Sequence, residues 1–363
     1  MSRHTIPILI GNDNSKKASC IETFQKLPQE DLHSWLAAQQ ERGLQLQHDN
    51  EKTLLASSNT DAGSVSFLVI GRPLDTIAPL DDLLNRCNSR LTDGGTLCCM
   101  ATPAAVKRQQ LRQRWPWGIR NIAVAIHHLW HHVAAKLWIS RGLYRLVTGE
   151  HHRSMSRVEI LGRLRHAGFD ITYQHVHGNT LTLCATRIGD PIPEPPHIGA
   201  FIGLPRIGKG GKQVRIYKIR TMHAYSEFLQ ADLYSRHHLT KKGKIQHDYR
   251  VTFVGHWLRK HWIDEWPMLF NLLRGDIKLV GVRPLSESFF RLYSPEMQRL
   301  RTQYKPGLLP PLYAQPINAN NLDSVQESER QYLEAYTQHP LRTDWHYFWR
   351  IVGNIVFRRR RSA

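Results

Sequence analysis

Residues 248–284 read DYRVTFVGHWLRKHWIDEWPMLFNLLRGDIKLVGVRP, and this stretch determines how the second half of the chain is interpreted. It places two adjacent carboxylates, Asp264 and Glu265, directly before a short apolar run that Gly275 closes. This spacing predicts a helix over residues 264–274, with a carboxylate at its N-cap and a glycine just past its end. The positive dipole end of such a helix favours negative charge at Asp264.

Basic residues flank this carboxylate pair on both sides. Arginine supplies planar forked donors that match phosphate oxygens, and lysine supplies a compact positive charge. The pattern therefore predicts an ionised Asp264 that can serve as a nucleophile or a metal ligand, next to groups that bind phosphate. The alternative interpretation is an ordinary N-cap followed by a first-turn glutamate. The flanking cations are Arg250, Arg259, Lys260, Arg274 and Arg283.

The net charge of +19 is unevenly distributed along the 363 residues. Residues 199–363 carry 27 Lys and Arg against 13 Asp and Glu, whereas residues 1–198 carry 22 against 17. The second half should therefore face an anionic partner, such as nucleotide phosphates, an anionic membrane or nucleic acid. A specific nucleic-acid partner is not predicted, because the basic residues fall in scattered blocks without a recognition-helix or zinc-finger pattern.

The first part of the chain alternates between predicted strands and helices, which is typical of an α/β domain. A capping box formed by Ser156 and Glu159 begins the last helix of this part. Four prolines within 189–198 favour extended backbone, so this segment is predicted to link domains 1–188 and 199–363. The predicted elements are strands over 65–71, 96–101, 169–175 and 180–187, turns at 93–95 and 178–179, and helices over 80–91, 156–166, 255–262, 264–274 and 324–338.

The five cysteines are scattered without metal-binding spacing, which predicts free thiols in a reducing cytosol. No apolar run reaches the roughly 20 residues of a bilayer-spanning helix, so we expect a cytoplasmic protein that at most lies on the membrane surface. Two segments have the aromatic, aliphatic and basic composition of an interfacial helix, although a core-packing helix is the alternative for each. They are residues 115–139 and residues 347–357 with the arginines at 358–361.

Residues 206–307 resemble the bacterial sugar transferase family, the monotopic polyprenyl-phosphate phosphoglycosyl transferases of capsule, exopolysaccharide and O-antigen assembly. The matching blocks follow one another in family order, and so many ordered blocks argue against a chance match. These blocks are residues 206–208 with Gly211, 217–222, 248–252, 255 with 258–260, 263–267, 271–276, 279–285 and 304–307.

The resemblance implies a mainly α-helical, α+β transferase domain and a role for each site residue. Asp264 would attack the β-phosphorus of a UDP-sugar, release UMP and hold the sugar phosphate covalently. A polyprenyl phosphate, typically undecaprenyl phosphate, would then accept the sugar phosphate and so begin a polysaccharide. Glu265 would hold Mg²⁺, with Asp264 as a second candidate ligand. Phosphate binding would fall to Lys218, Arg220, Arg250, Arg259 and Arg283, unless some of these pair with Asp248, Asp276 or helix ends.

The chain departs from the family pattern in four places. The family normally carries a hydrophobic re-entrant helix before the block at 206–208, where this chain has its proline-rich segment. Val282 replaces the usual proline, Trp266 replaces the usual leucine, and residues 308–311 lack the usual glycine. We therefore expect peripheral contact with the inner face of the cytoplasmic membrane, with other polysaccharide-assembly enzymes as further partners.

Residues 65–187 resemble the C-terminal half of a class I methyltransferase-like domain, because a turn leads into a strand and a helix precedes a closing strand pair. The glycine-rich cofactor loop of such enzymes is absent from residues 1–64, so we expect a degenerate Rossmann-like scaffold without S-adenosylmethionine. Three alternatives to the transferase stay open. They are a methyltransferase-like enzyme with a basic appendage, a nucleic-acid-binding protein, and an inactive family member that acts as a basic adaptor or partner subunit.

Overall fold

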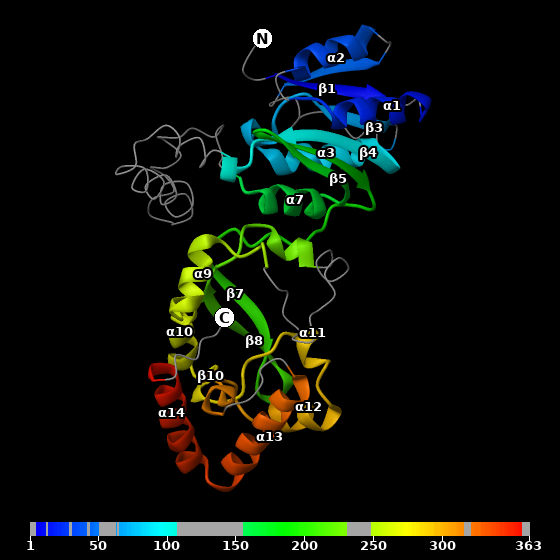
Figure 1. The fold of residues 1–363 in the computed structure, drawn as a ribbon. Coiled ribbons are helices and arrows are strands. Elements are labelled where there is room, and N and C mark those ends of the chain that lie inside the picture. Colours follow the sequence, from blue (N-terminus) through cyan, green and yellow to red (C-terminus); the bar gives the residue numbers. More distant parts are fainter. Residues whose placement is uncertain are drawn as a thin grey trace, which may run out of the picture. The chain divides into compact units, whose positions relative to one another are not determined.

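The chain folds into two compact units (Figure 1). The first comprises Met1–Ile198 and His223–Ala231, and the second comprises Gly199–Met222 and Asp232–Ala363. The predicted linker, residues 189–198, lies at the end of the main segment of the first unit. The structure is a computed structural model, and it describes residues 5–11, 14–28, 31–41, 44–50, 63, 65–106, 155–230, 248–315 and 321–357.

The first unit is built around a six-stranded sheet with the strand order β2-β1-β3-β4-β6-β5. Strands β3 and β4 pair in parallel, and the other pairings are antiparallel. The strands are β1 (Thr5–Gly11), β2 (Gln45–Asn50), β3 (Val65–Ile70), β4 (Leu91–Ala101), β5 (Phe169–His177) and β6 (Thr180–Arg187). The helices are α1 (Asn14–Gln25), α2 (Leu32–Glu41), α3 (Leu80–Arg90) and α7 (Arg157–His166).

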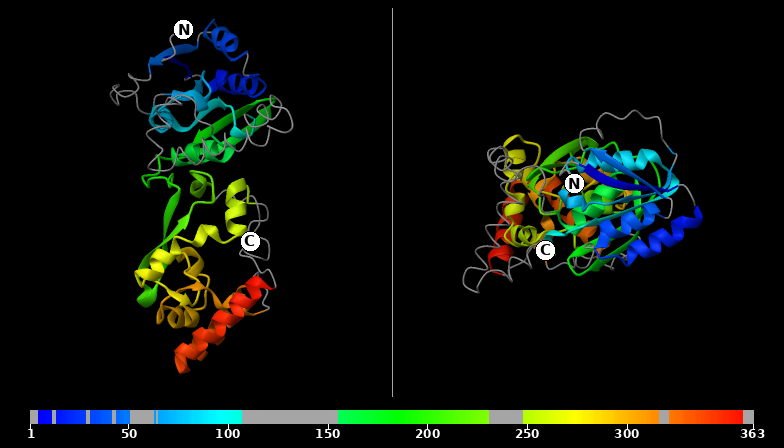
Figure 2. Two further views of the ribbon diagram at one scale, coloured as in Figure 1. Left: turned by 90° about the vertical axis from the view of Figure 1, so that its left-hand side faces the viewer. Right: turned by 90° about the horizontal axis from the view of Figure 1, so that it is seen from above.

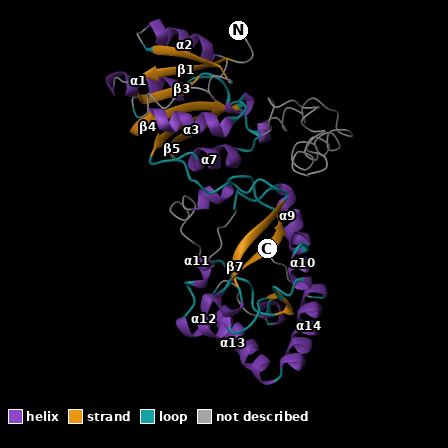
Figure 3. Cartoon of the chain, turned by 180° about the vertical axis from the view of Figure 1, so that it is seen from behind, coloured by secondary structure: helices purple, strands orange, loops and turns teal. Residues whose placement is uncertain are grey.

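Helices cover both faces of this sheet (Figure 3). Phe67 and Val69 of β3 pack into a core with α1 and α2, whereas Leu68 and Ile70 pack into a second core with α3 and α7. Successive residues of a strand point to opposite faces, so a strand between two helical layers must be apolar throughout. This explains the uninterrupted hydrophobic run that identified β3 in the sequence.

Most predicted elements of this unit are confirmed. The N–H of Glu159 donates to the Oγ of Ser156 at 3.1 Å, as the capping box requires. Gly168 has a φ of +83° just past α7, a conformation that glycine adopts without strain. The predicted turn at 93–95 is wrong, because these residues lie inside β4, where Gly94 takes a φ of +74° beside a register shift against β3.

One segment from the second half of the sequence belongs to the first unit. Residues 223–230 include the short 3-10 helix η7 (Ser226–Leu229), which packs on α7. The buried guanidinium of Arg163 lies 4.2 Å from the ring centroid of Tyr225 and donates to its Oη at 3.1 Å. Gly162 leaves room for this contact, since a Cβ there would lie 2.2 Å from the carbonyl oxygen of Tyr225.

The second unit is mainly helical and contains two small sheets (Figure 2). Strands β7 (Phe201–Ile207) and β8 (Gln213–Ile219) form an antiparallel hairpin, and β9 (Lys278–Val280) pairs in parallel with β10 (Gly307–Leu309). The helices are α9 (Phe253–Lys260), α10 (Met268–Leu273), α11 (Glu287–Phe290), α12 (Pro295–Thr302), α13 (Leu322–Gln338) and α14 (Pro340–Val356). The 3-10 helices are η6 (Lys209–Gly211), η8 (Ile263–Glu265) and η9 (Pro311–Ala314).

The predicted interfacial segment at 347–357 is only partly correct. Tyr347 and Ile351 are buried in the core that α13 and α14 share with β9, so this face of the helix packs inside the protein. The exposed stripe of α14 begins earlier, at Leu341, Trp345 and Trp349, which are 88%, 66% and 54% exposed. The arginines at 358–361 and the second predicted segment, 115–139, lie outside the described residues. Within the described part of the chain, no helix has the length and hydrophobicity needed to cross a bilayer.

Candidate active site

The two carboxylates Asp264 and Glu265 lie in η8, between α9 and α10. The predicted helix over 264–274 with Asp264 as its N-cap is wrong, because α10 begins only at Met268 and Pro267 precedes it. Proline has no N–H to continue a helical ladder, so the N–H of Trp266 instead closes a separate turn on the carbonyl of Ile263 at 3.2 Å. The end of the helix is as predicted, since Gly275 follows it with a φ of +75°.

The residue before this turn has an unusual backbone conformation. Trp262 has a φ of +61°, a left-handed value that costs a residue with a side chain roughly 1–2 kcal/mol. Its ring packs edge-on against Tyr313, with 4.9 Å between the centroids. Strain of this kind persists where the surroundings hold it, and it is common near functional groups.

Helix α9 is hydrogen-bonded to Thr221, just past the end of β8. Its N-cap, Thr252, accepts from the N–H of Gly255 at 2.8 Å and donates its own N–H to the carbonyl of Thr221 at 2.9 Å. Gly255 permits this approach, because a Cβ there would lie 2.0 Å from the same carbonyl oxygen. On the next turns of α9, the Nε of Arg259 donates to the Oγ1 of Thr221 at 2.9 Å, so the side chain of Arg259 is held toward β8.

The buried side-chain amide of Asn271 joins helix α10 to strand β8 by hydrogen bonds. The Oδ1 of Asn271 accepts from the N–H of Tyr217 at 2.9 Å, and its Nδ2 donates to the carbonyl of Arg215 at 2.8 Å. The Nδ2 also donates to the Oδ2 of Asp276 at 3.0 Å, so both ends of the amide are satisfied. Since α9 and α10 both bind β8, the turn between them places Asp264 and Glu265 over this strand.

Lys218 of β8 meets the carboxylates there. Its Nζ donates to the Oε1 of Glu265 at 2.6 Å, and both side chains are largely buried. Burial lowers the pKa of Lys218, and Glu265 and Asp264 only partly offset that effect. Burial likewise lowers the pKa of Arg259, against the opposing charges of Asp264 and Asp248.

Asp264 itself has a raised pKa. Burial is the main cause, the neighbouring charge of Glu265 adds to it, and Lys218 and Arg259 act in the opposite direction. The cations considered in the sequence analysis do lower this pKa, but the desolvation of the carboxylate, which the sequence did not reveal, outweighs them.

Comparison with known proteins covers the same part of the chain. The model of the family "Bacterial sugar transferase" matches residues 195–358. This range includes the carboxylate dyad, Asp264 and Glu265, and every predicted cation. This segment belongs to the bacterial sugar transferase family. Residues 195–358 are called the sugar transferase domain below.

Several characterised or named relatives align with part of the chain. The galactosyl transferase CpsE of Streptococcus agalactiae serotype III is 36% identical over 142 residues, which cover 38% of this chain and 31% of the relative. The undecaprenyl-phosphate galactose phosphotransferase of Salmonella typhimurium is 36% identical over 128 residues (34% and 25%). The exopolysaccharide production protein ExoY of Rhizobium meliloti is 40% identical over 116 residues (30% and 50%). The chain thus spans half or less of the length of these relatives.

Arg250, one of the predicted phosphate-binding cations of the sugar transferase domain, is engaged within the protein. Arg250 is buried and makes a two-pronged ion pair with Asp248, with Nε–Oδ1 2.8 Å and Nη2–Oδ2 2.7 Å. This is the pairing that the sequence left open as an alternative to phosphate binding. Arg220 lies past the end of β8, and its backbone N–H donates to the carbonyl of Ala200 at 2.8 Å, a bond that does not involve the guanidinium.

Two arginines, Arg283 and Arg206, add further positive charge to the cluster that contains Lys218 and Arg259. Arg283 is exposed on the segment after β9, and its charge acts on Lys218, Arg259 and Arg206. Burial and Arg283 together lower the pKa of Arg206, and no carboxylate of the described residues forms an ion pair with either arginine. Arg206 stood in a matching block but was not predicted to bind phosphate, because a single arginine at the end of a strand carries no distinguishing signal.

Proposed function

We propose that the sugar transferase domain transfers a sugar 1-phosphate from a UDP-sugar to a polyprenyl phosphate, through a covalent phosphosugar intermediate on Asp264. The observation that carries this proposal is the position of Asp264, which is half-buried beside Glu265, Lys218 and Arg259 in a family of sugar transferases. The names of the relatives support a galactose or other sugar phosphate and a lipid carrier. Such a transfer would begin the synthesis of an exopolysaccharide, capsule or O-antigen.

The chemistry follows from the charges at the site. A carboxylate oxygen of Asp264 attacks the β-phosphorus, the bond from this phosphorus to the bridging oxygen breaks, and UMP leaves with that oxygen. An oxygen of the polyprenyl phosphate then attacks the same phosphorus and releases Asp264. Partial burial makes the ionised carboxylate less solvated and more basic, which suits a nucleophile, while Lys218 and Arg259 limit how far its pKa rises.

The donor set of the dyad fits a magnesium ion. Mg²⁺ is usually bound by one or two protein carboxylates, with substrate phosphates and water in the remaining positions. Glu265 would hold the ion, with Asp264 as the second candidate, and the bound ion would neutralise charge on the diphosphate.

Arg283 is the predicted cation that is best placed to bind the phosphates, and Arg206 joins it. Both guanidinium groups lack an ion-pair partner in the described part of the chain, whereas Arg250 is already paired. Cations that are close together without a carboxylate between them repel one another, and an anion relieves that repulsion. Arg283 and Arg206 should therefore bind substrate more strongly than Arg250 does.

A membrane-facing surface would give the site access to a long lipid. Helices α9, α10 and α14 follow one another along one side of the second unit (Figures 1 and 3). We define this lipid face by its exposed apolar side chains, and an apolar patch with aromatic residues beside basic groups suits the interface of an anionic bilayer. Its members are Phe253, Trp257, Trp266, Leu269, Phe270, Leu273, Leu341, Trp345 and Trp349.

The transfer is tested by following UMP release from a panel of UDP-sugars with Mg²⁺ and polyprenyl phosphate. At least one sugar should turn over, and Asp264→Asn should lower the rate by roughly 10³-fold or more, because a nucleophile is removed. Asp323→Asn, the same chemical change on an exposed residue of α13, serves as the matched control and should leave the rate unchanged. Full activity of Asp264→Asn would overturn the mechanism, and no turnover with any sugar would leave the basic adaptor as the better description.

The lipid face is tested by sedimentation with vesicles that contain anionic phospholipid. The double variant Trp345→Ala with Trp349→Ala should bind about tenfold more weakly, a loss of roughly 1.4 kcal/mol. Leu292→Ala is the control, since Leu292 is exposed just after α11, a helix that contributes no residue to the lipid face. Equal binding of both variants would remove α14 from the membrane contact.

The interpretation of the first unit as a degenerate methyltransferase-like domain also remains a proposal. The order β3–α3–β4, followed by α7 and the β5–β6 hairpin, supports it, whereas β1 runs antiparallel to β3. Calorimetry with S-adenosylmethionine should detect no binding, and tight binding would make this unit a second candidate enzyme.

A further inference from the structure

A buried ion pair joins two helices close to the candidate active site. Arg301 of α12 and Glu329 of α13 form an ion pair, and their side chains are only 5% and 3% exposed. The guanidinium also stacks on the ring of Tyr293, 4.8 Å from its centroid. A buried ion pair often stabilises a protein no more than apolar residues of the same volume would, so its geometry is the feature to explain.

Arg301 makes one further hydrogen bond, to the backbone of Arg283 at the candidate active site. Its Nη2 donates to the carbonyl oxygen of Arg283 at 2.6 Å. On either side of Arg283, the backbone is held by other partners, since Gly307 donates to the carbonyl of Val282 and Ile207 donates to that of Leu285, both at 2.9 Å. The backbone of Arg283 is thus fixed while its side chain stays exposed.

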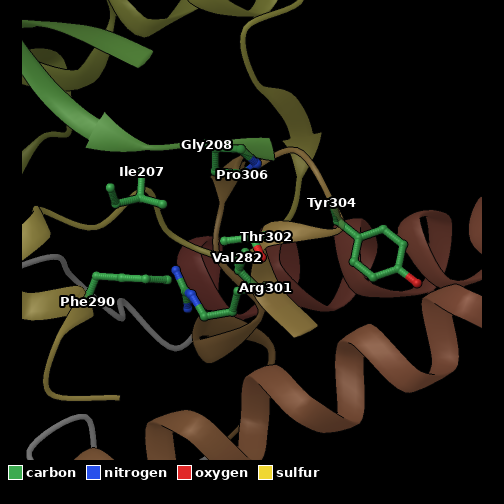
Figure 4. A pocket seen from close by; sticks show the side chains of 8 residues that line it. All are labelled: Ile207, Gly208, Val282, Phe290, Arg301, Thr302, Tyr304 and Pro306. Atoms are coloured by element: carbon green, nitrogen blue, oxygen red, sulfur yellow. The ribbon is translucent and has the colours of Figure 1, made fainter. Parts of the chain in front are cut away.

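Arg301 itself has little room to bind a substrate. Figure 4 shows the pocket beside it, which Ile207, Phe290 and Thr302 also line. Its free interior is about 10 Å³, which is room for about one water molecule and not for a diphosphate. The guanidinium therefore acts on neighbouring protein groups.

We propose that Arg301, oriented by Glu329, is a positioning residue that holds Arg283 in the place from which it binds the transferring phosphate. This inference rests on the proposed function, in which Arg283 contacts the substrate. The planar guanidinium can reach Glu329 with one nitrogen and the carbonyl of Arg283 with another. A lysine keeps the charge but not this fork, so Arg301→Lys should leave the ion pair with Glu329 and release the backbone of Arg283.

The test is a double-mutant cycle of Arg283→Ala and Arg301→Lys, measured on the full chain by kcat, KM and the affinity for UDP. Each single variant should lower kcat/KM by roughly 10- to 100-fold, because a displacement of about 1 Å at a positioned group costs this much. The double variant should be no worse than Arg283→Ala alone, since Arg301 acts only through Arg283. UDP affinity should follow the same non-additive pattern.

A matched control separates positioning from stability. Asp344 pairs with Lys278 at 2.9 Å and accepts from Tyr332 in the same core of the second unit, so Asp344→Asn should lower the melting temperature without changing kcat. Losses of Arg283→Ala and Arg301→Lys that add, in turnover and in UDP affinity, would overturn the inference. If UDP affinity is coupled while no UDP-sugar turns over, the positioning role is supported and the proposed transfer fails.

Discussion

Each unit of this protein contains a cluster of partly buried charges, and the two clusters are built differently. In the first unit, Arg163 is enclosed by Asp81 at 2.6 Å and Glu159 at 3.0 Å. Burial alone would lower the pKa of Arg163, but the two carboxylates more than offset it and the pKa is raised. In the second unit, burial prevails, so the pKa values of Lys218 and Arg259 are lowered and that of Asp264 is raised.

This difference distinguishes a structural cluster from a chemical one. Where each charge has its partner, the charged forms are stabilised and the cluster holds segments together, as Arg163 holds α7 to Tyr225. Where the charges are incompletely compensated, the cluster is ready to gain from a further charged ligand. The directions of the pKa shifts therefore agree with the proposal that the chemistry takes place in the second unit.

The largest effect on stability is expected from the structural cluster. Arg163→Ala leaves Asp81 and Glu159 without their buried cation, and the free energy of unfolding of the first unit should fall by about 3–5 kcal/mol. Lys26→Ala, which breaks the exposed pair of Lys26 with Glu22, should leave the free energy of unfolding nearly unchanged. Denaturant titrations of both variants check the contrast, and a similar small loss in each would contradict it.

The variant Lys218→Gln tests the charge cluster of the second unit. As the pH is lowered, kcat/KM should begin to fall at a pH above the ordinary pKa of an aspartate, and we call this fall the acid limb of the pH profile. The reason is that Asp264 must lose its proton to attack and its pKa is raised. The charge of Lys218 lowers that pKa, so its removal should move the acid limb to higher pH and reduce the rate by about 10- to 100-fold. Turnover measured from acid to neutral pH decides this, and a limb that moves to lower pH would contradict the assignment.

The smallest expected effect is a gain of stability from Asp264→Asn. The pKa of Asp264 is higher in the folded than in the unfolded protein, so its contribution to stability is complete below the unfolded pKa and is lost as pH rises through the folded pKa. At neutral pH the variant should therefore be more stable by about 1 kcal/mol or less, because the group is half exposed and screened. The gain should vanish at acid pH, and thermal unfolding at both pH values tests its sign.

Much of the first unit could be predicted from its sequence, because its central elements carry strong local patterns. The apolar run of β3 and the capping box at Ser156 and Glu159 each predicted the element that the structure contains. Strands β1 and β2 and helices α1 and α2 were not predicted. Helices α1 and α2 are weakly patterned, and β2, with the sequence QLQHDN, gains its pairing only from β1. Strand β1 does carry a local signal, the apolar run TIPILIG, which the sequence analysis did not use.

The residues of the site could be proposed from the sequence, but their geometry could not. The raised pKa of Asp264 depends on burial. Burial depends on Asn271, which bonds residues of β8 that lie 54 and 56 positions earlier, and on Gly255, which lets α9 approach Thr221 just past that strand. Arg206 and Arg301 were missed for the same reason. Nothing in their local sequence indicates a neighbour, and only the folded chain brings them to Arg283.

The most direct test of the central claim is peptide mapping of the enzyme after incubation with a reactive UDP-sugar and Mg²⁺ in the absence of a lipid acceptor. We predict one sugar phosphate attached to the peptide that contains Asp264, and its disappearance when polyprenyl phosphate is added. Transfer to the lipid without any adduct, or with the adduct on another residue, would contradict the account.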